Sequence, residues 1–101
     1  MRMLFNITFP NATFNAAVKD GTADAKLGRI LEAVKPEAIY FTDHHGERGA
    51  VAIAEVADAS KIPALCEPWF LTFDADVEVR IAMTPDDLKK SGLDSIGKSW
   101  M

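Results

Sequence analysis

The 101-residue chain has one cysteine, Cys66, and no long apolar run. A single cysteine excludes an internal disulfide and suits a reducing compartment. The apolar segment near the N-terminus is interrupted by Asn6, Thr8 and Pro10. It is therefore too short and too polar for a signal sequence or a membrane span. We expect a cytoplasmic protein that does not enter membranes.

Basic residues are also few, with 11 Lys and Arg against 15 Asp and Glu and a formal net charge of -4. Without a Lys/Arg stripe, binding to nucleic acid or to an anionic membrane surface is disfavoured. The six glycines are scattered and form neither a GxGxxG nor a Walker pattern, so no nucleotide cofactor is implied. We expect no cofactor.

What is present is the composition of an ordinary globular chain, 49% hydrophobic and 26% charged. A chain of this length fits a single domain spanning residues 1–101, with 85–101 as a tail. Period-two alternation predicts a strand over residues 2–9. Helical spacing follows over 12–34, where Asp20-Gly21-Thr22 divides it into two pieces and Lys35-Pro36 ends it.

The second half of the chain predicts two further strands, a helix, a fourth strand and a short helix. Residues 37–45 and 49–57 form a β-hairpin in this interpretation, with a turn at Gly46-Glu47-Arg48. Ser60 is the expected N-cap of a helix that runs through Phe73. A strand over residues 74–83 and a short C-terminal helix follow; Thr84 caps this helix, Pro85 opens it and Gly92 stops it.

The element order is therefore βαββαβ with a helical tail. This order predicts an α+β, ferredoxin-like fold, in which two helices cover one face of a four-stranded antiparallel sheet of order 4-1-3-2. The other face stays bare unless something packs on it. In the dimeric α+β barrel proteins, which this chain resembles in length and element order, two bare faces close around a cavity. We expect a homodimer of this kind.

The segments "KPEAIYFTDHHGERG" and "IPALCEPWFLTFDADVEVRIAMTPDDL" extend this resemblance. They are similar to a family of uncharacterised bacterial proteins of about this length, over most of the chain. Some members carry a pantothenate synthetase label. The residues here argue against that activity, because it implies a much longer chain and a His-x-x-His phosphate-binding element. The resemblance therefore implies a fold and leaves the activity open.

The two histidines, His44 and His45, are adjacent near the end of a predicted strand. Neighbours on a strand point to opposite faces, so these side chains are not expected to share one metal or one proton. Asp43 and His45 share a side, but Cys66 belongs to the apolar stripe of a helix. Since a zinc site needs three or four protein ligands, we predict no metal site.

The bare face of the sheet offers a better candidate, if the large apolar side chains of each strand turn toward the helices. Its predicted ligand-binding residues are polar: Asn6, Thr8, Tyr40, Thr42, His44, Glu78 and Arg80. Ala50, Ala52 and Ala54 are expected to leave room above the third strand. Polar groups around an apolar floor are typical of a small-ligand pocket.

The chemistry of several side chains on this face suggests catalytic roles. Arg80 can hold a carboxylate or enolate, His44 can move a proton near neutral pH, and Tyr40 and Asn6 can donate to an oxyanion. The simpler alternative is a wet polar face on which Glu78 and Arg80 only pair with each other.

Other reactive or aromatic side chains have plainer interpretations. Trp69, Phe70 and Phe73 are expected to be core or dimer contacts, and Cys66 a buried apolar residue. Three functions stay open: a small-molecule-binding homodimer, a cofactor-independent monooxygenase- or isomerase-like enzyme acting on a small aromatic or keto compound, and a structural or interaction module.

Overall fold

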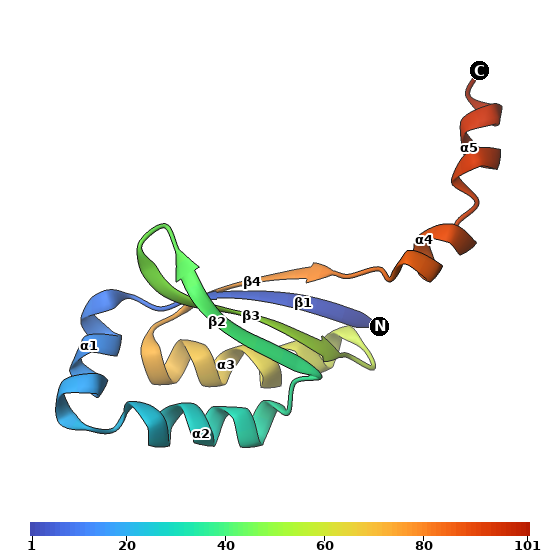
Figure 1. Ribbon diagram of the computed structural model, residues 1–101. Helices are drawn as coiled ribbons and strands as arrows, with labels where there is room; N and C mark the ends of the chain where they lie inside the picture. Colours follow the sequence, from blue (N-terminus) through green and yellow to red (C-terminus); the bar gives the residue numbers. More distant parts are fainter.

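The computed structural model describes residues 1–101 and shows one sheet with helices on one side (Figure 1). The strands are β1 (Arg2–Thr8), β2 (Ala38–His44), β3 (Glu47–Glu55) and β4 (Asp76–Ile81). The helices are α1 (Asn11–Asp20), α2 (Ala23–Val34), α3 (Ile62–Phe73), α4 (Pro85–Lys90) and α5 (Leu93–Ser99), with a short 3-10 turn at Ala59–Lys61. None of these helices has the length and apolar content that a membrane crossing requires.

The sheet has the order β2-β3-β1-β4 with every neighbouring pair antiparallel. This confirms the predicted ferredoxin-like arrangement and strand order. In β1 the residues alternate strictly between buried and half-buried, as the period of a strand with one covered face requires. The predicted break between the first two helices is also present, where Gly21 takes a left-handed conformation at φ 79°.

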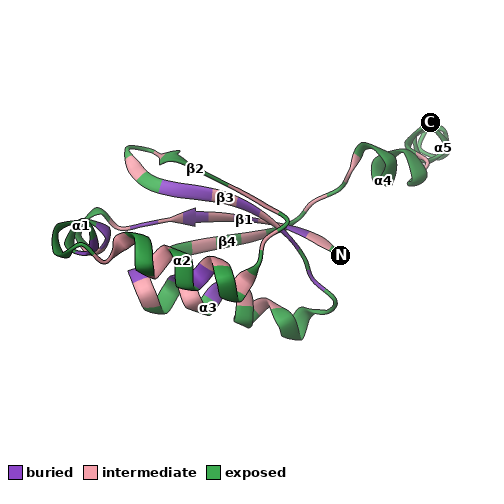
Figure 2. Ribbon diagram, turned by 60° about the horizontal axis from the view of Figure 1, so that its bottom comes forward, coloured by how far each residue is buried: buried purple, intermediate pink, exposed green.

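The core lies between β1, β3 and the inner sides of the helices, as the burial pattern shows (Figure 2). At its centre are four aromatic rings. Phe9 lies 5.0 Å from Phe14, 5.2 Å from Phe73 and 5.8 Å from Trp69, measured between ring centroids. Trp69 and Phe73 are thus core residues, whereas the third predicted aromatic contact, Phe70, lies at the surface.

The predicted position of the β3 alanines is wrong. Ala52 is paired directly with Phe5, and residues directly opposite each other in a sheet share a face. Ala50, Ala52 and Ala54 are therefore buried against the helices. Ala52 and Ala54 border a narrow crevice with Trp69, so small residues here make room for a bulky helix side chain.

Two local predictions are also corrected. The hairpin turn consists of His45 and Gly46, at φ 53° and 84°, so His45 leaves the strand and Glu47 pairs with His44 in the ladder. Two residues at positive φ are typical of a two-residue hairpin turn of type I′. The predicted N-cap, Ser60, lies inside the 3-10 turn before α3. Asp58 caps this turn by accepting a hydrogen bond from the Ser60 amide, and α3 itself begins without a side-chain cap.

The chain ends in an extended segment, residues 82–101, which we call the C-terminal arm. Its first helix, α4, has the predicted start: Thr84 accepts a hydrogen bond from the Asp87 amide, and Asp87 accepts one from the Thr84 amide. Gly92, at φ 73°, separates it from a second helix, α5, that was not predicted individually. The arm projects away from the sheet and helices (Figure 1).

Candidate functional site

The open face of the sheet carries all seven predicted ligand-binding residues. The pairing registers place even-numbered residues of β1, β2 and β4, and odd-numbered residues of β3, on the side away from the helices. One row across the sheet is Tyr40, Val51, Asn6 and Glu78. The next row is Thr42, Gly49, Thr8 and Asp76.

A polar cavity of about 300 Å³ lies at the hairpin end of this open face. None of its lining residues is hydrophobic; they are Asn6, Thr8, His44, His45, Glu47, Asp76 and Glu78. Four of these were predicted from the sequence. Asp76 was missed although it shares parity with Glu78, and His45 and Glu47 were missed because the turn was placed one residue too late.

His44 is positioned by a contact across the central strand. Its Nδ1 atom lies 3.2 Å from Thr8 Oγ1, within hydrogen-bonding distance. Between their strands lies β3, where Gly49 offers no side chain. A Cβ atom at residue 49 would stand 2.5 Å from His44 Cδ2. Glycine is required at residue 49 because the imidazole lies so close to the strand. The His44 ring, held there by Thr8, forms one wall of the cavity.

The remaining predicted residues share the face but do not line the cavity. Tyr40 and Thr42 lie on the edge strand β2, and Tyr40 is 73% exposed. Arg80 is paired with Leu4, one row beyond Glu78 and farther from the hairpin end. The structure therefore does not bring Arg80 and His44 into one cavity within a single chain.

The charge of the cavity follows from its lining. It has three carboxylates, from Glu47, Asp76 and Glu78, and no Lys or Arg. Such a lining attracts cations and hydrogen-bond donors, such as hydroxyl groups, and repels carboxylate ligands. No three His, Cys, Asp or Glu side chains come together in an arrangement that could hold a metal ion.

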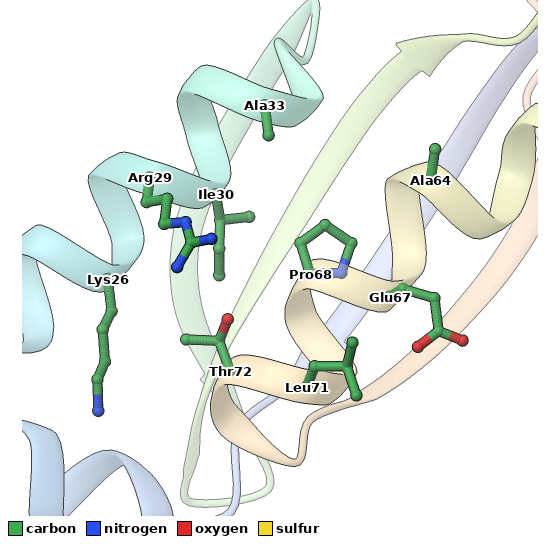
Figure 3. A pocket seen from close by; sticks show the side chains of 9 residues that line it. All are labelled: Lys26, Arg29, Ile30, Ala33, Ala64, Glu67, Pro68, Leu71 and Thr72. Carbon is green, nitrogen blue, oxygen red and sulfur yellow. The ribbon is translucent and has the colours of Figure 1, made fainter.

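A larger hollow, of about 710 Å³, lies on the opposite side of the molecule between α2 and α3. Its lining residues are Lys26, Arg29, Ile30, Ala33, Ala64, Glu67, Pro68, Leu71 and Thr72 (Figure 3). Most of these side chains are exposed, Leu71 to 80%. No hydrogen bond or ion pair organises them. We therefore place the candidate site on the open face.

Cys66 does not offer a nucleophile. The side chain is buried in α3, and desolvation, reinforced by the nearby Glu67 carboxylate, raises the pKa of its thiol. Burial disfavours the thiolate, which is the reactive form. Its predicted role as a small buried apolar residue fits this position.

No protein-family model and no curated protein matches the sequence significantly. Among solved structures, the chain is similar to 5-chloro-2-hydroxyhydroquinone dehydrochlorinase (TftG) from Burkholderia phenoliruptrix AC1100, in complex with 2,5-dihydroxybenzoquinone. The TM-score is 0.61 at 17% identity, over 85% of this chain and 97% of that one. A second similar structure is the de novo designed protein Ferredog-Diesel, with TM-score 0.45 and 17% identity over 80% and 85% of the two chains. At such identities the dehydrochlorinase relates the folds only, and the resemblance to a bacterial family stays a prediction.

Proposed function

We propose that this chain is a cytoplasmic homodimer that binds a small, uncharged, hydroxylated organic molecule on its open face. In this proposal two copies pack through their open faces and enclose the polar cavity around His44. The observation that carries the proposal is the His44–Thr8 contact across Gly49. A glycine within a strand often marks a point of close approach, here that of the His44 ring to the strand.

Dimerisation is supported by the composition of the open face. Its centre is apolar, with Leu4, Val51 and Ile53 only half-buried in the single chain. Water contact with such a surface is unfavourable by about 25 cal/mol for each Å². A second copy of the same face would remove it from water and close the cavity.

The ligand class follows from two parts of the open face, the polar cavity and the apolar centre beside it. Hydroxyl groups can donate to the carboxylates of Glu47, Asp76 and Glu78 and accept from the Asn6 amide. A ring or short carbon chain can lie against Val51, which stands beside Asn6 in the register. The dehydrochlorinase of similar fold was solved with 2,5-dihydroxybenzoquinone, which supports a hydroxylated ring as the organic part of the ligand.

A second candidate function is an enzyme on a compound of this kind, acting without a cofactor. It is favoured by the position of His44, whose ring faces a cavity that also contains carboxylates. His44 would move a proton and Asn6 would donate to the developing oxyanion. Arg80 and Tyr40 would act only if dimerisation brought them to the cavity. A structural module without a ligand is the third candidate.

The proposal is tested by oligomeric state and by binding. Light scattering coupled to size exclusion at micromolar concentration is expected to show a dimer. Titration with hydroquinone, a neutral dihydroxylated ring, should shift the backbone NMR signals of Asn6 and Gly49, whereas benzoate, a carboxylate, should not. His44→Ala should weaken hydroquinone binding at least tenfold. The control Asp43→Ala, on the same strand but the other face, should not.

A monomer at these concentrations would remove the enclosed cavity and overturn the proposal. So would signals that respond to neither compound, which would favour the structural module. If the proposal stands, native mass spectrometry of protein taken directly from its source separates the binding and enzyme candidates. A co-purified compound would identify the chemistry to assay.

A further inference from the structure

The C-terminal arm lies outside the compact part of the molecule. The principal extents are 60 × 29 × 18 Å and the radius of gyration is 17.0 Å, whereas a compact chain of this length has about 13 Å. The arm is fixed at its root, where the Ala82 amide donates to the Arg2 carbonyl at 3.0 Å. Beyond this point α4 and α5 run away from the body (Figure 1).

The second helix of the arm has an apolar stripe without a covering surface. Leu93 and Ile96 lie in α5 and Trp100 is the C-cap that follows it. Their spacing of i, i+3 and i+7 is that of one helix face. They are 53%, 48% and 85% exposed. The opposite face is polar, with Asp94, Ser95 and Lys98. A helix of 7 residues is marginal in water by itself, so this stripe calls for a packing partner.

The exposed surface of the chain is larger than a compact fold requires. The accessible area is 6974 Å² for 11.0 kDa, compared with about 5,600 Å² for a compact monomer of that mass. The excess exceeds the roughly 800 Å² that each partner buries in a standard interface. A stable dimer therefore has more than enough area available if the arm takes part.

The position of the arm indicates which copy it can reach. Figures 1 and 2 show the arm on the side of the sheet opposite α2 and α3, the same side as the open face. The arm runs beyond the end of the sheet where β4 ends, so a second copy stacked on that face would lie beside the root of the arm. With the two-fold axis along the strands, β4 of one copy lies over β2 of the other, and β2 begins at the end of the sheet where β4 ends.

The β2 edge supplies a matching surface. Tyr40 and Phe41 are 73% and 51% exposed on this edge strand, whose outer backbone groups are unpaired within the chain. Exposed apolar edge strands are normally covered or protected by charges. We infer that the arm of each copy docks on the second copy, with the stripe of Leu93, Ile96 and Trp100 over the β2 edge at Tyr40 and Phe41. The inference rests on the proposed face-to-face dimer and adds an exchange of arms, which a two-fold axis makes reciprocal.

Cross-linking of the full chain tests the contact. Trp100→p-benzoylphenylalanine is made in unlabelled protein and mixed, with subunit exchange, with wild-type protein labelled with ¹⁵N. After irradiation, we expect mass spectrometry to find the unlabelled arm joined to the labelled peptide that carries Tyr40 and Phe41. A cross-link within one chain, one to another region of the second copy, or none in a mixture that is dimeric would overturn the inference.

Substitutions separate this inference from the proposed function. Ile96→Asp, within the stripe, should weaken the dimer at least tenfold in sedimentation experiments. The control Ser95→Asp, on the polar side of the same helix, should change it less than twofold. If the wild-type chain is dimeric and Ile96→Asp is equally tight, arm exchange is wrong while the face-to-face dimer stands. If the wild-type chain is monomeric, the proposed function itself fails.

Discussion

His44 Nδ1 and Thr8 Oγ1 lie 3.2 Å apart although β3 separates their strands. The side chains meet because Gly49, between them, has no Cβ. One wall of the polar cavity therefore depends on the contact between His44 and Thr8 and on the missing side chain at Gly49. This dependence also makes the candidate site accessible to small, well-defined substitutions.

Gly49→Ala is expected to displace the imidazole. The new methyl group would stand 2.5 Å from His44 Cδ2, and the side chain can rotate away, so the free energy of unfolding should change by no more than about 1 kcal/mol. The ring ¹⁵N shifts of His44 should report the lost hydrogen bond to Thr8. The control Gly28→Ala, where nothing lies within 4 Å, should leave these shifts unchanged and stabilise α2 by roughly 0.5–1 kcal/mol. Unchanged His44 shifts in Gly49→Ala would contradict the geometry.

Phe73→Ala is expected to disrupt the aromatic core. Phe73 is fully buried and its ring lies 4.9 Å from Phe14 and 5.2 Å from Phe9. Replacing a buried phenylalanine with alanine costs about 3–5 kcal/mol, a large part of the stability of a small domain. Urea unfolding measures this loss. Leu71→Ala, at a side chain 80% exposed, is the control and should stay within about 0.5 kcal/mol. Equal effects would argue against the core described here.

Cys66 should react slowly with alkylating reagents in the folded protein. Burial is the main cause that raises the pKa of its thiol, with the Glu67 charge second, so the thiolate fraction at pH 8 is reduced below that of an exposed cysteine. We expect iodoacetamide to modify native protein at least tenfold more slowly than protein in urea. Because the chain has one cysteine, total labelling reads this site directly. Similar rates in both states would show that the thiol is open to solvent.

Glu37 should titrate below the ordinary glutamate value of about 4.3. Arg2 donates to its carboxylate from Nε at 3.0 Å and from Nη2 at 3.1 Å, and this hydrogen bonding is the main cause that lowers the pKa of Glu37. The folded pKa is the lower one, so the pair stabilises the fold above the unfolded pKa and this contribution is lost as pH falls through the folded pKa. Glu37 is exposed and Arg2 is half-buried, so solvent screening keeps the effect on stability small, and NMR titration is the better measurement.

Arg2→Met should return the Glu37 pKa toward its ordinary value. Arg80→Met, a second arginine on the open face, should leave it where it is. A wild-type Glu37 that already titrates at the ordinary value would show that the two-point contact does not persist in solution.

Much of the fold could be predicted because residues within or beside an element specify its buried face and its ends. Strict alternation in β1 specified its buried face, Gly21 and Pro36 marked the helix ends, and Thr84 specified the start of α4. The third strand was different. Its residues 49–54 are apolar on both faces, so alternation separated alanines from Val51 and Ile53 without saying which set faces the helices. Pairing with Phe5 decided it.

Only part of the candidate site could be predicted, because alternation assigns side chains to faces but does not locate the hairpin turn. The parity of β1, β2 and β4 placed Asn6, His44 and Glu78 on one face correctly. The cavity itself depends on where the hairpin turns, and His45 adopts a positive φ that no spacing rule required. A one-residue change in the turn decides which side chains meet at that end of the sheet.

The amino-acid sequence alone determined the element order, the strand order and the faces of the strands whose apolar and polar residues alternate, because these depend on local conformational preference and on burial of one face. Only the tertiary structure decided the orientation of β3, the approach of His44 to Thr8 over Gly49, and the projection of the arm. Those features depend on contacts between residues far apart in the chain, and their geometry is set by packing, which periodicity does not encode.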